Sequence, residues 1–183
     1  MNFVTMDSML VSSMLVGSIS TCVMSATASA NRASATAASS GTAMTTTGAA
    51  VACEGGCACG AIRYRVTGGP TALVLCHCRD CRIASGAPAL AWAVFRTDDV
   101  AWLHGEPRQF VSSPGVSRGF CGRCGTTLSY RRDTRADCID VTSATFDEPG
   151  RFAPLREIWT AQRLPWISAN ASLAQHPGSS KSG

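Results

Sequence analysis

Seven of the ten cysteines in this chain stand in three short clusters whose spacing suits metal binding. The clusters have the patterns C-x-C, C-x-C-x-x-C and C-x-x-C, and they contain Cys57, Cys59, Cys76, Cys78, Cys81, Cys121 and Cys124. Cysteines this close in sequence would close loops that are too short for most unstrained disulfides. Thiolate pairs with these spacings are typical of zinc sites. We therefore predict that the clusters bind metal rather than form cross-links.

The first and third clusters together predict a closed, structural zinc site. An extended C-x-C segment places the sulfurs of Cys57 and Cys59 on one side of the chain. Cys121 and Cys124 form a zinc knuckle, with glycine inside and after the pair. Four thiolates complete a tetrahedral site with Zn–S bonds of about 2.3 Å. Because the two halves lie about sixty residues apart, the ion would couple metal binding to folding.

The middle cluster, residues 76–82 with the sequence CHCRDCR, supplies three thiolates without an obvious fourth ligand. Zinc with three protein ligands and a vacant position is typical of catalytic or substrate-binding sites. An exogenous thiol would enter that position well and would be held as a thiolate. We predict that Cys76, Cys78 and Cys81 hold a second, catalytic zinc ion.

Four residues are alternatives for the fourth ligand of this second site. His77 lies between two predicted ligands, but in an extended C-x-C segment its side chain points away from both sulfurs. We therefore interpret His77 as a packing residue that supports the ligands rather than as a ligand. Cys53, Cys138 and His104 could also complete the site in space, although isolated residues of these types are more often simply packed.

Charged residues beside the middle cluster have two alternative roles. Arg79 and Arg82 could balance the negative charge of the thiolates, or they could bind a substrate carboxylate through paired hydrogen bonds. We predict the second role and assign both as substrate-binding residues. Asp80 could accept a proton, although a solvated turn carboxylate is the more usual role.

Composition limits both the core and the class of partner. Aromatic residues make up 7% of the 183 residues, so the core is thinner than the 45% hydrophobic content suggests. The formal net charge is +4, but seven thiolates with two Zn²⁺ would add a net −3 and leave the loaded protein near +1. The basic excess is therefore weak evidence for nucleic-acid binding, and we expect no nucleic-acid partner.

The remaining pattern favours a mostly β fold. Short segments with strand character are separated by turn residues, and they cover 62–66, 73–76, 89–95, 100–103, 108–112, 118–121, 126–131, 138–142 and 155–159. The continuously apolar segment 89–95 is a candidate central strand. No long, capped segment with a helical period follows residue 50. We predict small twisted antiparallel sheets organised around the two zinc sites.

Both ends of the chain differ in composition from this middle part. Residues 1–50 hold only two charged residues and become rich in Ser, Thr, Ala and Gly from about residue 26. We predict that these residues form a disordered leader, or that the start codon has been assigned upstream of the true start of translation. A weak signal peptide is the second choice. The apolar stretch within 9–24 is too weak for a membrane span. The zinc domain would cover 52–170 and a flexible tail 171–183.

Three segments carry a resemblance to a known family: GCACGAIRY at 56–64, CHCRDCR at 76–82 and GFCGRCGT at 119–126. In this order they resemble the glutathione-dependent formaldehyde-activating enzyme family, which also includes centromere protein V. The resemblance extends over about residues 52–170. It implies a compact fold of small twisted β-sheets with two zinc ions, the structural one on the first and third clusters and the catalytic one on the middle cluster.

The resemblance also implies a function. The reference activity of the family joins formaldehyde to the glutathione thiol, giving S-(hydroxymethyl)glutathione, and is classed as that of a carbon–sulfur lyase. We therefore expect a cytoplasmic zinc enzyme that acts on a small thiol and an aldehyde, without a membrane partner. Two alternatives remain, a zinc-stabilised binding module and a redox or metal sensor that uses exposed thiolates. A binding module for nucleic acid would favour a basic extension, whereas residues 1–50 contain a single arginine.

Overall fold

A computed structural model describes residues 52–179 of the protein. The predicted leader, residues 1–50, lies outside the described residues. The strands in the described part are β1 (Cys53–Gly56), β2 (Arg63–Val66), β3 (Ala72–Cys76), β4 (Leu90–Arg96), β5 (Val100–His104), β6 (Arg108–Ser113), β7 (Val116–Phe120), β8 (Thr127–Arg132), β9 (Cys138–Thr142), β10 (Arg156–Ile158) and β11 (Ala174–His176). The helices there are α1 (Arg79–Ser85) and short 3₁₀ turns at Thr97–Asp99, Asp133–Arg135, Ser143–Thr145, Pro149–Phe152 and Thr160–Gln162.

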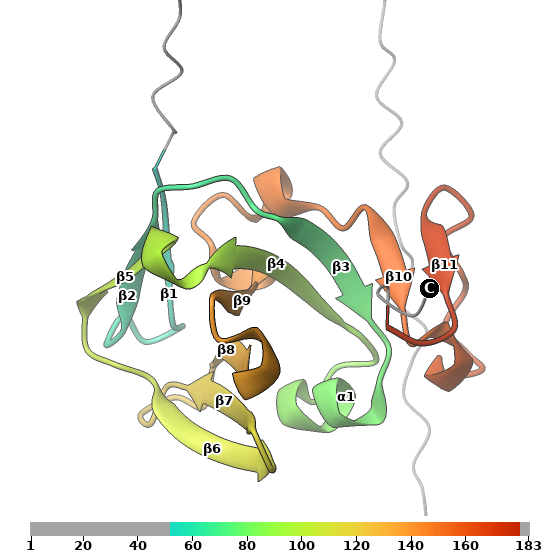
Figure 1. Ribbon diagram of the computed structural model, residues 1–183, viewed down its shortest axis with the longest axis horizontal. Helices are drawn as coiled ribbons and strands as arrows, with labels where there is room; N and C mark the ends of the chain where they lie inside the picture. The colour runs from blue at the N-terminus through green and yellow to red at the C-terminus, as the bar shows by residue number, and fades with distance from the viewer. Residues whose placement is uncertain (1–51, 180–183) are drawn as a thin grey trace, which may run out of the picture. The chain divides into compact units, whose positions relative to one another are not determined.

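The strands form two sheets (Figure 1). The smaller sheet is antiparallel, with β2 between β1 and β5. The larger sheet has the order β11-β10-β3-β4-β9-β8-β7-β6 and is antiparallel apart from β10, which pairs in parallel with β3 and β11. The predicted mostly β fold with antiparallel sheets is confirmed, and the parallel pairs are an addition to it.

Alternating and continuous apolar patterns place the strands as the sequence predicts. Tyr64 and Val66 of β2 are buried while Arg65 between them is exposed. In β4, residues 92–95 are all buried, and the strand lies between β3 and β9. The predicted central strand is therefore confirmed, since a strand covered on both faces needs apolar side chains at successive positions.

The helix α1 was not predicted, because its start signal is a cysteine. The Cys78 side chain caps α1 by accepting a hydrogen bond from the Cys81 N–H at 3.3 Å. Helix caps are usually Ser, Thr, Asp or Asn, so sequence rules miss a sulfur in this role. The helix ends after seven residues at Gly86, which has a left-handed φ of +68°.

The described part of the predicted tail over 171–183 contains a short strand. Within it, β11 pairs with β10, and the Trp159 N–H donates to the Gly178 carbonyl at 2.8 Å. These backbone bonds hold residues 174–178 at the edge of the larger sheet. The predicted strand over 155–159 contains β10, whereas the three residues of β11 are too few to show a recognisable period in the sequence.

Buried side chains form two separate hydrophobic clusters, and each contains cysteines from the sequence motifs. The first includes the aromatic residues Tyr64, Phe95, Phe146 and Phe152 together with Cys57 and Cys121. The second includes Val74, Leu90 and Trp92 together with Cys76 and Cys81. Each core is small, as expected from the low content of large side chains. Each also borders one of the two groups of sulfurs. Within residues 52–179, the helices lack the length and apolar character needed to cross a bilayer.

We predict that Gly119→Ala lowers the free energy of unfolding by about 1–3 kcal/mol, because an added methyl group would overpack β7. It would overlap the Ser129 hydroxyl and lie 3.0 Å from the Pro107 side chain. Gly69→Ala is the matched control, since its methyl group would meet nothing within 4 Å. Urea unfolding of both variants measures the difference, and equal stabilities would contradict the packing described here.

Candidate metal centres

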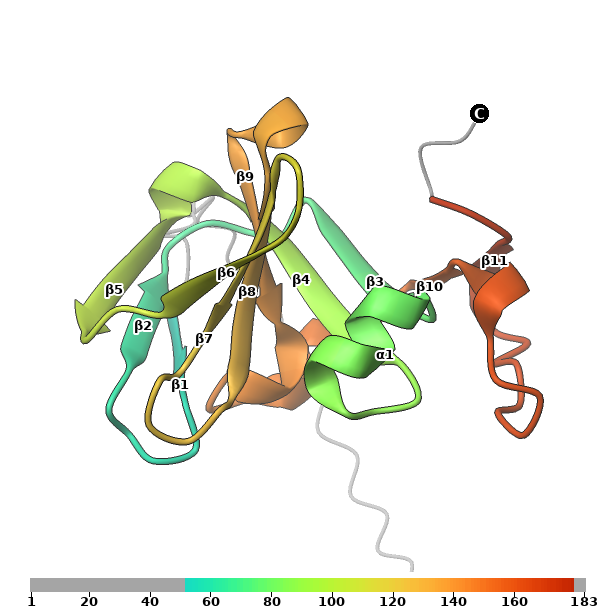
Figure 2. The same cartoon turned by 90° about the horizontal axis from the view of Figure 1, so that it is seen from below.

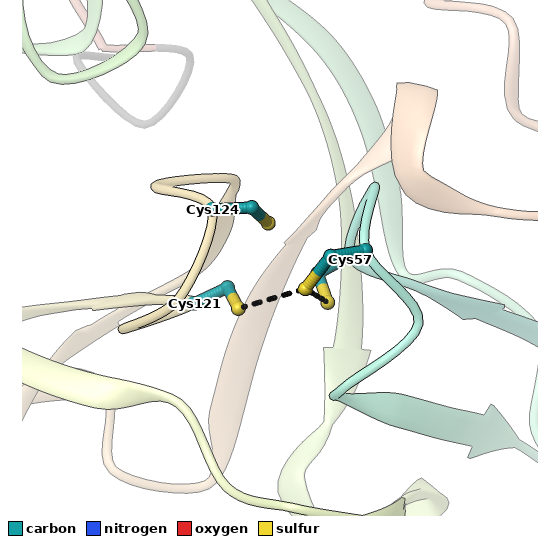
Figure 3. A group of neighbouring side chains, drawn as sticks. Cys57, Cys121 and Cys124 are labelled. Carbon is teal, nitrogen blue, oxygen red and sulfur yellow. Dashed lines mark hydrogen bonds between the residues drawn. The ribbon is translucent and has the colours of Figure 1, made fainter.

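Four cysteine sulfurs from two distant loops meet in one place (Figure 3). Cys57 and Cys59 follow β1, Cys121 and Cys124 follow β7, and all four sulfurs lie within 4.8 Å of one another. The sulfur of Cys59 is 3.6 Å from that of Cys57 and 3.8 Å from that of Cys121. A tetrahedral ion with metal–sulfur bonds of about 2.3 Å separates its sulfur ligands by about 3.8 Å. The predicted first group is therefore assembled with distances that suit such an ion.

Each of the two loops that carry this group makes a tight turn that ends at a glycine. The Cys57 carbonyl accepts from the Gly60 N–H at 3.0 Å, and the Cys121 carbonyl accepts from the Gly125 N–H at 2.8 Å. Both glycines have a positive φ, +72° and +76°, which side chains with a Cβ rarely adopt. The turn also directs backbone N–H groups at sulfur, as the Ile62 N–H donates to the Cys57 sulfur at 3.2 Å.

Hydrogen bonding favours a thiolate within this first group. The Thr126 hydroxyl lies 3.1 Å from the Cys124 sulfur. This bond and that of the Thr126 backbone N–H lower the pKa of the Cys124 thiol to about 5. A group with a thiolate at neutral pH attracts a cation, so the local hydrogen bonds prepare the site for metal.

The second group stands where β3 ends and α1 begins. The sulfurs of Cys76, Cys78 and Cys81 lie within 4.8 Å of one another. Cys76 and Cys81 are buried, and Cys78 is partly open to solvent. Hydrogen bonds from the thiols of Cys76 and Cys81 lower the pKa of Cys78 to about 2, whereas the pKa of Cys76 is raised by its bonds to the other two. The three sulfurs thus share protons, and these hydrogen bonds favour a thiolate at Cys78.

No fourth protein ligand joins the second group among residues 52–179. His77 is completely buried, and its Nε2 lies 3.0 Å from the Glu157 carboxylate, which agrees with its interpretation as a packing residue. Cys53, Cys138 and His104 lie on β1, β9 and β5, and none of them is part of the group. Among residues 52–179 the group therefore offers three protein ligands to a metal ion.

A buried ionic network fixes the segment between the first two sulfurs of this group. Glu157, which is 2% exposed, binds His77, the Arg163 guanidinium and the Asn170 backbone N–H. Burial alone would raise the pKa of Glu157, but these three hydrogen bonds lower it below its usual range. The ionised carboxylate therefore connects the middle cysteine cluster to the C-terminal segment.

The two predicted substrate-binding arginines lie in different surroundings. The Arg82 Nε donates to the His77 carbonyl at 3.1 Å, so this side chain holds the backbone of the cysteine cluster. Arg79 is exposed and lines a pocket of about 400 Å³ between α1 and the β6–β7 hairpin, together with Asp80. Figure 2 shows this hairpin beside α1. Arg118 of β7 lines the same pocket, and its Nη1 lies 3.9 Å from the Cys81 sulfur.

Sequence reasoning did not single out Arg118 and Glu157 as members of the site. Arg118 is 37 residues from Cys81, and Glu157 is 80 residues from His77. Neither residue stands in a motif with fixed spacing to its partner. The one available signal is that both are charged residues inside predicted strands. A charged side chain that faces the core of a protein needs a buried partner.

Comparison with protein families gives the same assignment as the cysteine motifs. The model of the glutathione-dependent formaldehyde-activating enzyme family matches residues 52–162, which include all seven clustered cysteines. The chain belongs to this family. The resemblance identified in the sequence is thus confirmed, and the family match covers both sulfur groups and the pocket beside them.

Curated relatives align with part of the chain. An uncharacterized lyase of Schizosaccharomyces pombe is 34% identical over 77 residues, 42% of this chain and 56% of the relative. A putative glutathione-dependent formaldehyde-activating enzyme of Halomonas elongata is 33% identical over 84 residues, 41% of this chain and 53% of the relative. The chain thus spans just over half the length of these relatives. A crystal structure of a Rhodobacter sphaeroides protein, 19% identical, covers 67% of this chain and 98% of its own with a TM-score of 0.43.

We predict that Cys121→Ser destabilises the metal-loaded protein more than Cys78→Ser does. The first group closes a loop of 62 residues between Cys59 and Cys121, whereas the second closes one of five residues. Loop-closure entropy then makes the loss of the first link more costly by about 2 kcal/mol. Urea unfolding with metal analysis checks this, and a larger loss for Cys78→Ser would contradict it.

We also predict that Glu157→Gln weakens metal binding at the second group by about ten- to a hundredfold, because its carboxylate orients the backbone between two ligands. Affinity at the first group should stay unchanged. Glu148→Gln is the control, since Glu148 is exposed and its one ion pair, with Arg151 at 3.9 Å, lies on the surface of the described residues. Competition with a chromophoric chelator during Zn²⁺ titration resolves the two affinities. Equal weakening at both groups would indicate general unfolding instead.

Proposed function

We propose that the protein is a zinc-dependent enzyme of the carbon–sulfur lyase type that forms or cleaves the adduct of a small thiol with formaldehyde or another small aldehyde. The observation that carries this proposal is the second sulfur group, where three cysteines meet without a fourth protein ligand among residues 52–179. The names of the relatives, a lyase and a glutathione-dependent formaldehyde-activating enzyme, support the same reaction class. Glutathione is therefore the first thiol to test.

Zinc is the proposed metal at both groups, with two ions per chain. Soft thiolate ligands favour Zn²⁺ over harder cations, and four thiolates in a tetrahedron are the usual surroundings of structural zinc. Cys57, Cys59, Cys121 and Cys124 would hold the structural ion, and Cys76, Cys78 and Cys81 the other. Zinc at the second group would keep an added thiol ionised, which is the chemistry it supplies to the reaction. A reducing compartment such as the cytoplasm would preserve these seven thiols.

The proposed reaction is an addition in which atoms and charge balance. The thiol releases its proton, and its sulfur forms a bond to the aldehyde carbon. The C=O double bond becomes a single C–O bond, and the oxygen takes up a proton to give a hydroxyl group. In the reverse direction the C–S bond breaks and the aldehyde is released. Asp80, a carboxylate that lines the pocket, would carry the proton between the two positions.

Positioning is the main contribution expected from the protein, because the addition already proceeds without an enzyme. The pocket beside the second group would hold the thiol in one orientation, and Arg79 at its rim would attract a carboxylate. Arg82 would act indirectly, by holding the His77 carbonyl in place. The rate enhancement should therefore depend on the three sulfurs and on the pocket together.

We predict that Cys78→Ser binds one zinc ion per chain instead of two and exchanges formaldehyde with glutathione no faster than the uncatalysed reaction. Two-dimensional exchange NMR measures this rate with the full-length, zinc-loaded protein. Cys138→Ser is the matched control, because Cys138 lies outside both sulfur groups, and it should keep two zinc ions and the rate of the wild type.

The outcomes separate the proposed enzyme from the alternatives. Retained rate enhancement in Cys78→Ser would exclude the second group as the reaction site. A wild-type rate equal to the uncatalysed one, with two zinc ions bound, would favour a zinc-stabilised binding module. Loss of zinc and a disulfide within residues 76–81 under mild oxidation would favour a redox sensor.

A further inference from the structure

The pocket between α1 and the β6–β7 hairpin has the size and wall of a small-molecule site. Its volume of about 400 Å³ lies in the usual range for such pockets. Much of the wall is apolar, including Ile83 and Phe110, which are 63% and 59% exposed. Two arginines and one aspartate interrupt this wall. The lining includes Arg79, Asp80, Ile83, Phe110, Ser112 and Arg118.

Arg118 differs from the other arginines because it is buried. It is only 7% exposed, and its guanidinium lies 4.9 Å over the ring of Tyr130. Nε donates to the Ser112 hydroxyl at 3.3 Å, and Nη1 lies 3.9 Å from the Cys81 sulfur. These contacts hold the side chain between the pocket and the second sulfur group. Arg118 is thus the pocket residue that also contacts a sulfur of the second group.

Arg118 forms no salt bridge with a carboxylate among residues 52–179, although its charge acts on Asp140 and on the sulfurs of Cys78 and Cys81. The Asp140 carboxylate is itself paired with Arg135 at 2.5 Å. The Nη2 group of Arg118 forms no hydrogen bond within the described residues, although Nε and Nη1 do. A buried guanidinium normally binds an anion, and because Arg118 lines the pocket, an anion bound there would meet it.

We propose that this pocket selects thiols that carry a carboxylate, and that Arg118 is the residue that binds this carboxylate while the sulfur lies at the three-cysteine group. The inference rests on the proposed function and adds the determinant of its thiol specificity. Arg79, at the exposed rim, attracts the same anion, and Ile83 and Phe110 contact the apolar part of the ligand.

The alternative role of Arg118 is only to balance the negative charge of the cysteine thiolates, since its Nη1 lies 3.9 Å from the Cys81 sulfur. The two roles differ in a measurable way. A residue that only balances thiolate charge affects every thiol ligand equally, whereas a carboxylate-binding residue affects only ligands that carry the carboxylate. A comparison of two ligands in two proteins isolates the interaction between the guanidinium and the carboxylate.

The test uses the full-length protein with Co²⁺ in place of zinc and the ligands N-acetylcysteine and N-acetylcysteine amide, which differ only at the carboxylate. The cobalt absorption bands report thiol binding at the metal. We predict that Arg118→Gln weakens the binding of the acid by about 10- to 100-fold and leaves that of the amide nearly unchanged. Arg132→Gln is the matched control, since Arg132 lies 5.9 Å from the same Tyr130 ring but is exposed and outside the pocket.

A second variant keeps the test decisive if Arg118→Gln does not fold. Ile83→Glu removes an apolar contact for both ligands and adds a negative charge to the pocket wall, so it should weaken the binding of the acid by about two- to fivefold more than that of the amide. Leu155→Glu is its control, because Leu155 is 64% exposed and lies outside the pocket. Equal effects on acid and amide in both variants would overturn the inference alone. A wild-type cobalt spectrum that neither thiol changes would overturn the proposed function and the inference with it.

Discussion

The close approach of ionisable sulfurs is the constraint on which the rest of this structure depends. Each group brings its sulfurs within 4.8 Å, and several thiolates at that distance repel one another. Protons shared between the sulfurs can relieve this repulsion, and the opposite pKa shifts of Cys76 and Cys78 reflect such sharing. A metal ion relieves it more completely, because it binds every sulfur at once. Loop positions and metal binding are therefore interdependent.

The two sulfur groups meet this constraint with different consequences for the fold. The first joins loops 62 residues apart and borders the aromatic cluster around Phe146, so its integrity affects the arrangement of both sheets. The second is confined to the end of β3 and the start of α1. Its orientation depends on the buried His77–Glu157 contact and on the capping of α1 by Cys78. The first group can thus stabilise the chain, while the second stays open to a ligand.

Short-range patterns predicted most of the strands and the members of both sulfur groups, because alternation and cysteine spacing are local properties. The features that were missed depend on contacts between distant segments. Glu157 reaches His77 across 80 residues, and Arg118 reaches Cys81 across 37. The parallel pairing of β10 with β3 and β11 follows no turn signal, since parallel neighbours need not be adjacent in sequence. A sulfur cap on α1 lies outside the usual capping residues.

In the proposed reaction, selectivity for the thiol would matter more than reduction of the barrier. Thiols add to formaldehyde without an enzyme, so a thiol held near three sulfurs gains little from electrostatic activation alone. A protein that acts on one thiol among many must recognise a part of the molecule that does not react. The buried guanidinium of Arg118 is the strongest such element beside the second group, because it is charged, fixed by Ser112 and Tyr130, and turned toward the pocket. The pocket that recognises the thiol and the sulfur group at which it reacts would then be neighbours, with the Arg118 side chain between them.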